Sequence, residues 1–442
     1  MIESLVNENK ILRGVKLKLF PTDEEEDYLK TLCYIRNLAH DWALRKLWDN
    51  YNSYKDDMDN YKVLSRVDLN NMFTEYRNSD DCDELLKLVQ TGTARIAFYD
   101  AIISFKRLRK QIPYGIKPRY HGKHNRIRVS YGIRPDTSYI LDGKLCTPNL
   151  NGLPKLRIEL LTQEFNGYGA NMKSDMVDKR WYNPRVVKET DGWYITFTTP
   201  RDRNTSMDDD PWTEPIGIDL GCKTTFQLST EEFFNQPDVS RERETVSIVS
   251  KDLKRLYNLR KLKAHNSGLH VWEIPPSKRE LKLVDRRNRA LKRIHNRLVQ
   301  FYYKVVNNIV KRKPEAIVLE TIYVRDILRR VASPYVRKDI VQVYFCMIRY
   351  MFESKCDEYG IPLYEVDNHY PSSLICNRCK HKHEDLGDAR TFVCPVCGYT
   401  VDRDLNASLN LRDVYVNREG YNIKWWNGHG NKLILKDKTT TR

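Results

Sequence analysis

Four cysteines within a stretch of 22 residues constrain this chain more than any other feature of its sequence. They form two CxxC pairs with 14 residues between the pairs: Cys376, Cys379, Cys394 and Cys397. Two such pairs can direct four thiolates at one tetrahedral Zn²⁺, and Gly398 permits a tight turn after the last ligand. Disulfides or a redox-active pair fit this spacing poorly in a cytosolic chain, whereas His381 and His383 lie close enough to compete as ligands. The pattern therefore predicts one structural zinc ion in a zinc ribbon, which alone does not establish an enzyme.

Length and segment composition place the chain among cytoplasmic proteins with several domains. Its 442 residues are enough for two to four domains with cores of their own. No run of about 18 apolar residues occurs, and the N-terminus lacks the charged-then-apolar pattern of a signal peptide. The six remaining cysteines are scattered without a pairing pattern, as reduced cysteines in a cytosolic chain would be. We therefore expect a cytoplasmic protein with no membrane partner.

The positive charge favours a polyanionic partner. Lys and Arg number 75 against 59 acidic residues, a net charge of +16. Charge alone also fits a merely basic protein or a membrane-surface binder. Its placement says more, because residues 251–313 hold 19 Lys or Arg and four Asp or Glu. This region has a helical pattern, with Leu291, Ile294, Leu298, Phe301 and Val305 on one face. Its charges form either a solvated face or a nucleic-acid contact, and we favour the nucleic-acid contact.

Individual contacts are predicted where cations cluster or alternate with an aromatic residue, as in backbone-tracking and stacking sites. These candidates are Lys106, Arg107, Arg109, Lys117, Arg119, Tyr120, Arg286, Arg287, Lys292 and Arg293.

The order of patterns indicates two parts. A strand ends near Pro21, and Thr22 with the acidic residues after it begins a helical region that continues to about Arg109. Residues 115–200 contain short strands separated by Gly and Asn-Gly turns, which suggests an antiparallel sheet or small barrel. After a polar linker, strands at 216–221, 224–229 (antiparallel to the first), 316–320 and 363–367 alternate with helices at 251–313 and 338–359. This alternation predicts an α/β core.

Three acids lie in or next to this core: Asp219, Glu320 and Asp404. Each alone has an ordinary explanation as a strand-end carboxylate, but an acid in an apolar strand is unfavourable unless it binds something. Gly217 and Gly221 leave space beside Asp219 for backbone or phosphate. Carboxylates without a histidine nucleophile fit two Mg²⁺ ions, or Mn²⁺, that grip a scissile phosphate. Spacing alone does not establish that the three converge.

The motifs resemble those of the transposon-encoded TnpB family, relatives of the compact type V CRISPR nucleases of the Cas12f group. The resemblance covers about residues 12–412 and rests on the segments at 16–22, 36–44, 217–221, 318–320, 370–373 and 402–408 together with the cysteine pairs. It implies a RuvC-type RNase H-like core in which Asp219, Glu320 and Asp404 are catalytic metal ligands; Asp404, rather than Asp402, matches the family's Asp-x-Asn acid. It also implies a guide RNA from a transposon end or a CRISPR array, and a double-stranded DNA target cut on both strands beside a short motif. Monomer and homodimer both remain open.

The resemblance also implies a multidomain α+β organisation with an N-terminal wedge β-barrel, a helical recognition lobe and a zinc ribbon inserted in the nuclease core. The expected segments are 1–21 (first wedge strand), 22–114 (recognition), 115–200 (remaining wedge), 201–215 (linker), 216–370 (RuvC), 371–400 (zinc ribbon), 401–416 (last RuvC segment) and 417–442 (tail). Residues 51–82 and the tail match no motif of the family.

Two other functions are alternatives to a guided nuclease. One is a guided DNA-binding repressor without cleavage, against which the presence of all three acids argues. The other is a zinc-ribbon nucleic-acid-binding accessory protein of transposition that carries no guide.

Overall fold

The chain divides into two compact units, Met1–Asp202 and Arg203–Arg442. The structure is a computed structural model. It describes residues 10–89, 91–118, 120, 129–132, 138–147, 157–160, 168, 180–203, 214–271, 273–324, 328–329, 343–367, 369–384, 387, 389–417, 423–426 and 432–435. Arg119 and most of the predicted linker lie outside these residues.

Helices fill one part of the first unit. They are α1 (Asp23–Ser53), α2 (Arg66–Arg77), α3 (Glu84–Lys87) and α4 (Thr91–Arg109), followed by the short 3-10 helix η2 (Ile112–Tyr114). The predicted start of α1 is confirmed by a capping box, in which Glu25 N donates to Thr22 Oγ1 at 3.3 Å and Thr22 N to Glu25 Oε2 at 2.9 Å. The segment 51–82 contributes to this helical core, since Phe73 packs edge-on against Trp42 with ring centroids 5.0 Å apart.

An antiparallel sheet forms the rest of the first unit, in the order β2-β6-β7-β1-β5-β4-β3. Its strands are β1 (Lys10–Phe20), β2 (Val129–Gly132), β3 (Tyr139–Leu141), β4 (Lys144–Cys146), β5 (Arg157–Leu160), β6 (Tyr182–Glu189) and β7 (Gly192–Asp202). Buried residues of β1 and β7, such as Leu19 and Ile195, pack with Leu29 and Leu32 of α1.

The prediction of a closed barrel is not met: within the described residues the sheet is open, with β2 and β3 at its edges. Among the described residues β2 and β3 pair with one neighbour each and not with each other, so the sheet has two edges. The predicted linker also begins too early, because β7 runs through Asp202, which pairs with Lys10 of β1.

The second unit is built on a mixed sheet in the order β10-β9-β8-β11-β12-β15-β16. The central strands β8 (Ile216–Asp219), β11 (Ile317–Glu320) and β12 (Leu363–Val366) are parallel. As predicted, β9 (Phe226–Leu228) returns antiparallel to β8, and β10 (Phe233–Phe234) follows it. Side chains alternate between faces, so Ile218 and Leu319 enter the core formed with α6 (Lys278–Lys311) and α9 (Phe345–Tyr359), whereas Val318 and Val366 meet α10 (Arg403–Asn417).

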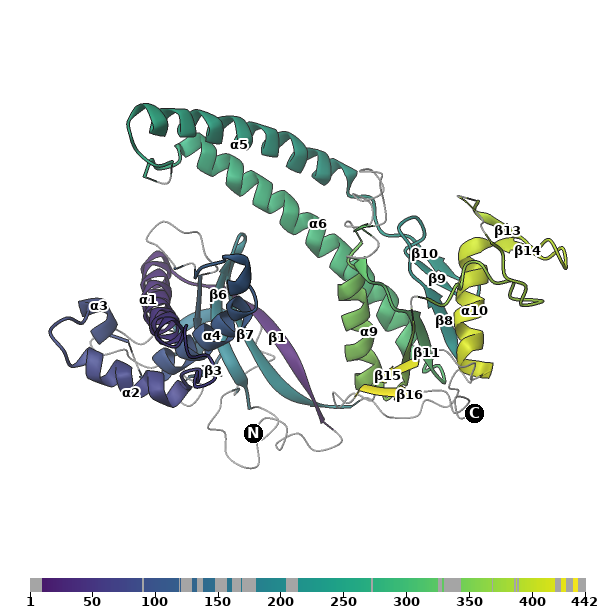
Figure 1. The fold of residues 1–442 in the computed structure, drawn as a ribbon, viewed down its shortest axis with the longest axis horizontal. Helices are drawn as coiled ribbons and strands as arrows, with labels where there is room; N and C mark the ends of the chain where they lie inside the picture. Colours follow the sequence, from purple (N-terminus) through teal and green to yellow (C-terminus); the bar gives the residue numbers. More distant parts are fainter. Residues whose placement is uncertain are drawn as a thin grey trace. The chain divides into compact units, whose positions relative to one another are not determined.

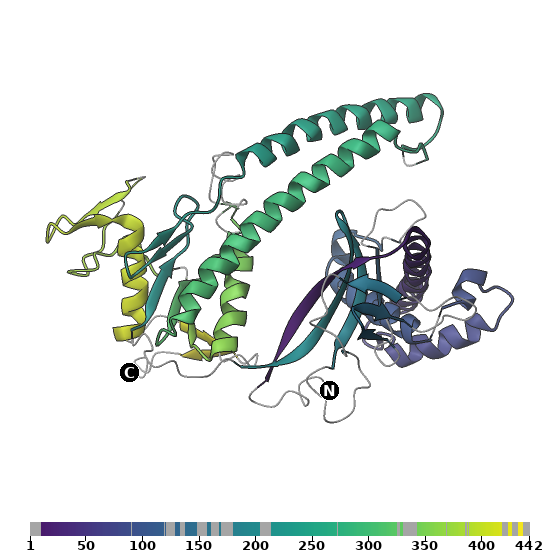
Figure 2. The ribbon, with the colours of Figure 1, turned by 180° about the vertical axis from the view of Figure 1, so that it is seen from behind.

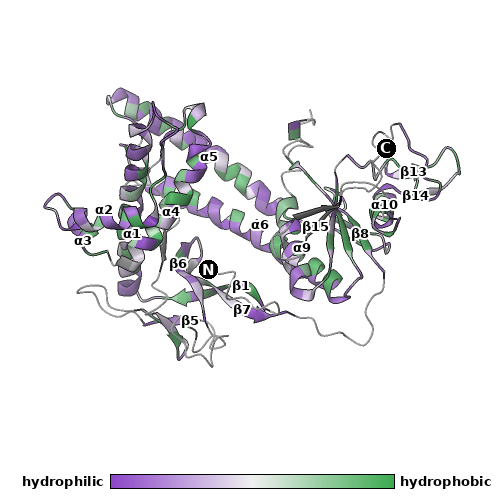
Figure 3. Cartoon of the chain, turned by 60° about the horizontal axis from the view of Figure 1, so that its bottom comes forward, coloured by the Kyte–Doolittle hydropathy of each residue, from purple (hydrophilic) through white to green (hydrophobic). Residues whose placement is uncertain are grey.

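The basic region before β11 is a helical hairpin rather than one continuous helix. Helix α5 (Ser240–Asn266) lies antiparallel beside α6 (Lys278–Lys311), as Figures 1 and 2 show. Along α6, hydrophilic and hydrophobic stretches alternate (Figure 3). Ile294, Leu298 and Val305 are buried as predicted, but Leu291 is 44% exposed because Ala290 takes the inward position there.

Two boundaries near the C-terminus also differ from the prediction. Helix α9 (Phe345–Tyr359) begins after Val343 and Tyr344, which are not helical; residues 338–342 of the predicted helix lie outside the described part. The tail, which matches no motif of the family, adds β15 (Ile423–Trp426) antiparallel to β12, and β16 (Lys432–Leu435) pairs with β15. No helix in the described residues carries an apolar stretch long enough to cross a membrane.

Candidate functional site

The four cysteines of the ribbon converge as the sequence predicts. Their ligand atoms all lie within 4.8 Å of one another, with Cys376 Sγ 3.6 Å from Cys397 Sγ and Cys379 Sγ 3.5 Å from Cys394 Sγ. Disulfide-bonded sulfurs would be about 2.05 Å apart. Zn–S bonds of about 2.3 Å in a tetrahedron place sulfurs about 3.8 Å apart. This cluster could therefore hold one structural zinc ion.

The two CxxC pairs have the same backbone geometry. Lys380 N donates to Cys376 O at 2.9 Å, and Gly398 N donates to Cys394 O at 3.0 Å. Lys380 and Gly398 both have positive φ, +61° and +68°. The sequence signalled the second turn through its glycine and gave no sign of the first.

Backbone N–H groups donate hydrogen bonds to the cysteine sulfurs and so favour their thiolate form. Burial opposes ionisation of Cys394, but hydrogen bonds from the backbone of Cys397 and Val396 lower its pKa to about 6. At Cys379 a hydrogen bond from the backbone of His381 is outweighed by burial and the neighbouring sulfurs, which raise its pKa to about 12. Mutual repulsion of this kind is what a divalent cation relieves.

The two nearby histidines do not join the ligand group among the described residues. His383 Nε2 lies 3.0 Å from Val393 O, and its ring packs edge-on against Phe392. His381 contributes its backbone oxygen, which accepts from Cys376 N at 2.8 Å.

Asp219 and Glu320 end two neighbouring parallel strands. Leu319 pairs with Ile218, so Glu320 of β11 is the next residue beside Asp219 of β8. Alternation along each strand turns Asp219 to the same face as Gly217, and Glu320 to the same face as Val318. Both acids therefore belong to the face of the sheet that α10 covers.

Asp404 reaches the same face from the first turn of α10. Asp402 is the residue before this helix, and its Oδ1 accepts from Asp404 N at 2.9 Å and Leu405 N at 3.2 Å. The carboxylate of Asp402 thus caps the helix, which leaves that of Asp404 available. The space beside Gly217 is taken by α10 itself, since a Cβ there would lie 2.1 Å from Ser408 O.

The three carboxylates are near enough to act on one another electrostatically. Burial raises the pKa of Asp219 well above its ordinary value, and the charges of Glu320 and Asp404 raise it further. Burial also raises the pKa of Glu320 to about 7. Within the described residues these three are not gathered as one tight ligand group like the cysteines.

Arg390 is a site residue that sequence reasoning missed. It stands just before β13 (Thr391–Val393), which pairs with β14 (Thr400–Asp402) in the ribbon hairpin. One guanidinium nitrogen lies 3.7 Å from Asp404 Oδ2, and another donates to Thr224 Oγ1 at 3.5 Å. No spacing or motif distinguished this arginine from the many others in the chain.

A pocket of about 350 Å³ opens beside Glu320. Its walls include Leu220, Phe345 and Tyr350, together with Arg349, which contacts Glu365. Of Asp219, Glu320 and Asp404, only Glu320 lines this pocket, whose other walls include side chains of α9 and of the core on the sheet face opposite α10.

The predicted nucleic-acid contacts occupy two regions, one in each unit. Lys106, Arg107, Arg109 and Lys117 are exposed at and after the end of α4, and the guanidinium of Arg109 lies 5.0 Å from the ring centroid of Tyr61. Tyr120 is half-buried, and the guanidinium of Arg45 lies 4.8 Å from the centroid of its ring. On α6, Arg286 and Arg293 are exposed and Arg287 and Lys292 are half-buried. Their role in binding stays a prediction.

Comparison with known proteins places this geometry in context. Residues 345–411, which hold α9, β12, the ribbon and the start of α10, match the Cas12f1-like TNB domain family. The chain resembles compact type V effectors. The structure of a Cas12f1–sgRNA–target DNA complex matches over 91% of this chain and 99% of that one, with a TM-score of 0.55 and 12% identity, a likeness of fold.

A curated relative supports the same resemblance over part of the sequence. The putative RNA-guided DNA endonuclease of Streptomyces pristinaespiralis is 28% identical over 205 residues, which are 45% of this chain and 44% of the relative. The chain thus spans less than half the length of that relative in the match.

Proposed function

We propose that this protein is an RNA-guided DNA endonuclease that pairs a guide RNA with target DNA beside a short motif and hydrolyses both strands in one RuvC-type site. The observation that carries this proposal is the placement of Asp219 and Glu320 at adjacent strand ends, on the face covered by the helix that begins next to Asp404. Three separate segments supply one corner with carboxylates, which a merely structural role does not require.

Asp219, Glu320 and Asp404 would hold two Mg²⁺ ions, for which Mn²⁺ is a substitute. The donor set fits, because buried carboxylates that repel one another are stabilised by a divalent cation. Bound there, the ions would supply an activated water and charge stabilisation at the leaving oxygen. The chain's own contribution is to fix the three acids on rigid elements and to bring Arg390 within 3.7 Å of Asp404.

Zinc in the ribbon would have a structural role, since all four ligands come from the protein. The basic hairpin α5–α6 suits the backbone of a guide–target duplex, because residues 251–313 hold 19 Lys or Arg against four Asp or Glu, and cations such as Arg286 and Arg293 are exposed. We assign guide and target-motif recognition to the first unit, whose exposed cations end α4. A resemblance to proteins whose names state an RNA-guided endonuclease and a Cas12f1–sgRNA–target DNA complex supports these partners.

The test is cleavage of a plasmid library with one target and randomised flanks. The protein is coexpressed with the RNA of its flanking locus, and copurifying RNA is sequenced. We expect RNA-dependent cutting that stops with EDTA or with Asp219→Ala, and that selects one flanking motif.

Two results would contradict the proposal. Target binding with copurified RNA but no cleavage under any divalent metal would instead identify a guided repressor. Absence of any discrete copurified RNA would identify a zinc-ribbon accessory protein.

A further inference from the structure

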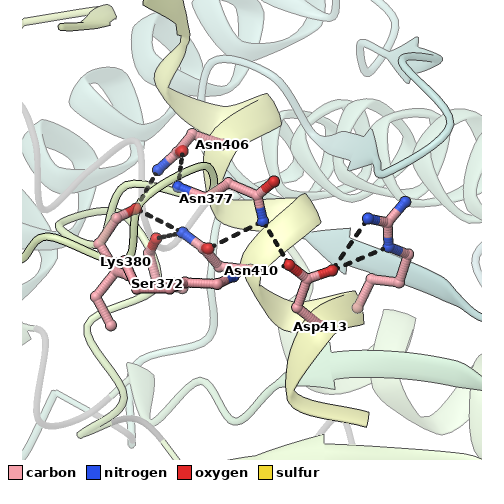
Figure 4. Close-up of polar contacts among 8 residues, drawn as sticks. Ser372, Asn377, Lys380, Asn406, Asn410 and Asp413 are labelled. Carbon is pink, nitrogen blue, oxygen red and sulfur yellow. Dashed lines mark hydrogen bonds and ion pairs between the residues drawn. The ribbon is translucent and has the colours of Figure 1, made fainter. Parts of the chain in front are cut away.

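A buried polar network joins the ribbon to one face of α10 (Figure 4). Asn377, inside the first CxxC pair, donates its backbone N–H to Asn406 Oδ1 at 3.0 Å. Its side-chain amide donates to Asn410 Oδ1 at 3.1 Å and to Asp413 Oδ2 at 2.8 Å. Residues 406, 410 and 413 follow helical spacing, so the first cysteine pair lies along two turns of α10.

The hydrogen-bond partners of Asn406 and Asn410 on α10 require an amide side chain at both positions. Asn410 Nδ2 donates to Ser372 O at 2.8 Å and to Ile375 O at 2.6 Å, so both donors and the oxygen of this amide are used. Asn406 donates to Ile375 O at 2.7 Å and accepts from Asn377. Both side chains are fully buried. An aspartate has nearly the same shape but no N–H donor, so only an amide satisfies these backbone oxygens.

The opposite side of α10 is fixed against the sheet. Ser408, also fully buried, and Arg412 approach Gly217 so closely that a Cβ would lie 2.1 Å from Ser408 O and 2.6 Å from Arg412 N. Asp404 lies in the first turn of this helix, which is held between these two contacts, and Asp402, the last residue of β14, caps the helix. The position of Asp404 is therefore set by the ribbon and by β8 together.

We propose that Asn410, with Asn406 and Asn377, is a positioning residue that couples the metal-dependent fold of the ribbon to the placement of Asp404 in the cation site. The inference rests on the proposed role of Asp404 as a metal ligand. Loss of either the ribbon metal or the Asn410 donors releases the same side of α10, so the two perturbations act through one contact.

The experiment uses Asn410→Asp in the full chain, with Asn235→Asp as the matched control, because Asn235 is an exposed asparagine in the loop after β10 of the same unit, outside the α5–α6 hairpin and the carboxylate site. Zinc content is measured by colorimetric release, and Mn²⁺ affinity by loss of the free-ion electron paramagnetic resonance signal. Mn²⁺ bound in Asp219→Asn is subtracted as the background of other sites. Cleavage is then titrated with Mg²⁺ in the guide-loaded protein.

We expect Asn410→Asp to retain one zinc while Mn²⁺ affinity at the Asp219-dependent site weakens, and the Mg²⁺ needed for half-maximal cleavage rises, by about tenfold or more. Wild-type protein stripped of zinc should show the same shift. Zinc removal from Asn410→Asp should add little further, since the contact is already lost. Asn235→Asp should match the wild type.

Unchanged metal affinity in a zinc-containing Asn410→Asp protein would overturn the coupling, because a merely structural role lowers thermal stability without changing cation affinity. If Asn410→Asp does not fold, the zinc-stripped wild type decides: unchanged Mn²⁺ affinity there refutes the proposal. Failure of the proposed function is recognised separately, since wild-type protein would then lack any cleavage or Mn²⁺ site that depends on Asp219.

Discussion

Replacing Gly217 by alanine tests how α10 is seated on β8. The added Cβ would stand 2.1 Å from Ser408 O, 2.6 Å from Arg412 N and 3.0 Å from Arg412 Cβ. Contacts of Cβ shorter than 3.0 Å essentially do not occur, so helix and strand must separate by about 0.9 Å to bring the first distance to 3.0 Å. The obstructing atoms belong mainly to the backbone, so no side-chain rotation relieves the overlap.

Two magnitudes follow from this displacement. Overpacking of a rigid core costs about 1–3 kcal/mol of unfolding free energy, and we expect the upper end because the asparagine contacts hold α10 from the other side. Asp404 moves with its helix. A shift of about 1 Å in a group with the role proposed for Asp404 reduces the rate by about a hundredfold, so under the proposed function the cleavage rate should fall by that order even where the protein remains folded.

The matched control is Gly14→Ala in β1, where an added Cβ meets nothing within 4 Å and φ is not positive. Calorimetry of the full chain and single-turnover cleavage are measured for both variants against the wild type. Gly14→Ala should be neutral or slightly stabilising, because alanine loses less conformational freedom on folding. If Gly217→Ala is as stable and as active as Gly14→Ala, the close approach of α10 to β8 is refuted, and with it the basis for placing Asp404 beside Asp219.

Three further perturbations address other parts of the chain. Arg390→Ala removes the cation 3.7 Å from Asp404 and should lower the single-turnover rate about tenfold to a hundredfold while zinc content stays constant; equal rates would exclude Arg390 from the site. Asp100→Asn weakens the charged hydrogen bonds from Arg185 and should lower the unfolding free energy by about 1.5–3 kcal/mol at pH 7. Burial opposes ionisation of Asp100, but Arg185 and Arg36 hold its pKa below the ordinary value. This stabilisation is therefore present above about pH 4 and lost as pH falls through the lowered pKa, so urea midpoints of mutant and wild type should converge in acid. Thr22→Ala should lower the unfolding free energy by about 1 kcal/mol, and Thr22→Ser should leave it almost unchanged in the same urea assay. Equal stability of the two variants would show that the capping box does not form.

Much of the candidate site could be predicted from the sequence, because the patterns that define it join residues close together in the chain. The cysteine pairs predict their cluster, since two residues between thiols already bring two ligands to one side of a turn. Thr22 followed by Glu25 predicts a helix start for the same reason: the bonds join residues three apart. The strands β8, β11 and β12 stand out as apolar runs that end in or just before acids.

Other predictions failed or could not be made because they depend on partners distant in sequence. Whether the first sheet closes depends on pairing between its edge strands, and β2 and β3 do not pair with each other among the described residues. Leu291 fits the apolar periodicity of α6, but 44% of it stays exposed among the described residues. The tail joins the second sheet through backbone pairing with β12, for which no side-chain pattern was needed.

The sequence by itself determined the ribbon, the helix caps and the strands that carry Asp219 and Glu320, because propensity, spacing and capping act over a few residues. Only the tertiary structure decided that these two acids share a face with the start of α10, that Gly217 is filled by that helix, and that Arg390 reaches Asp404 from the ribbon. Each of these depends on which elements pack together. That choice is made by the total burial and hydrogen bonding of the fold, so no single segment encodes it.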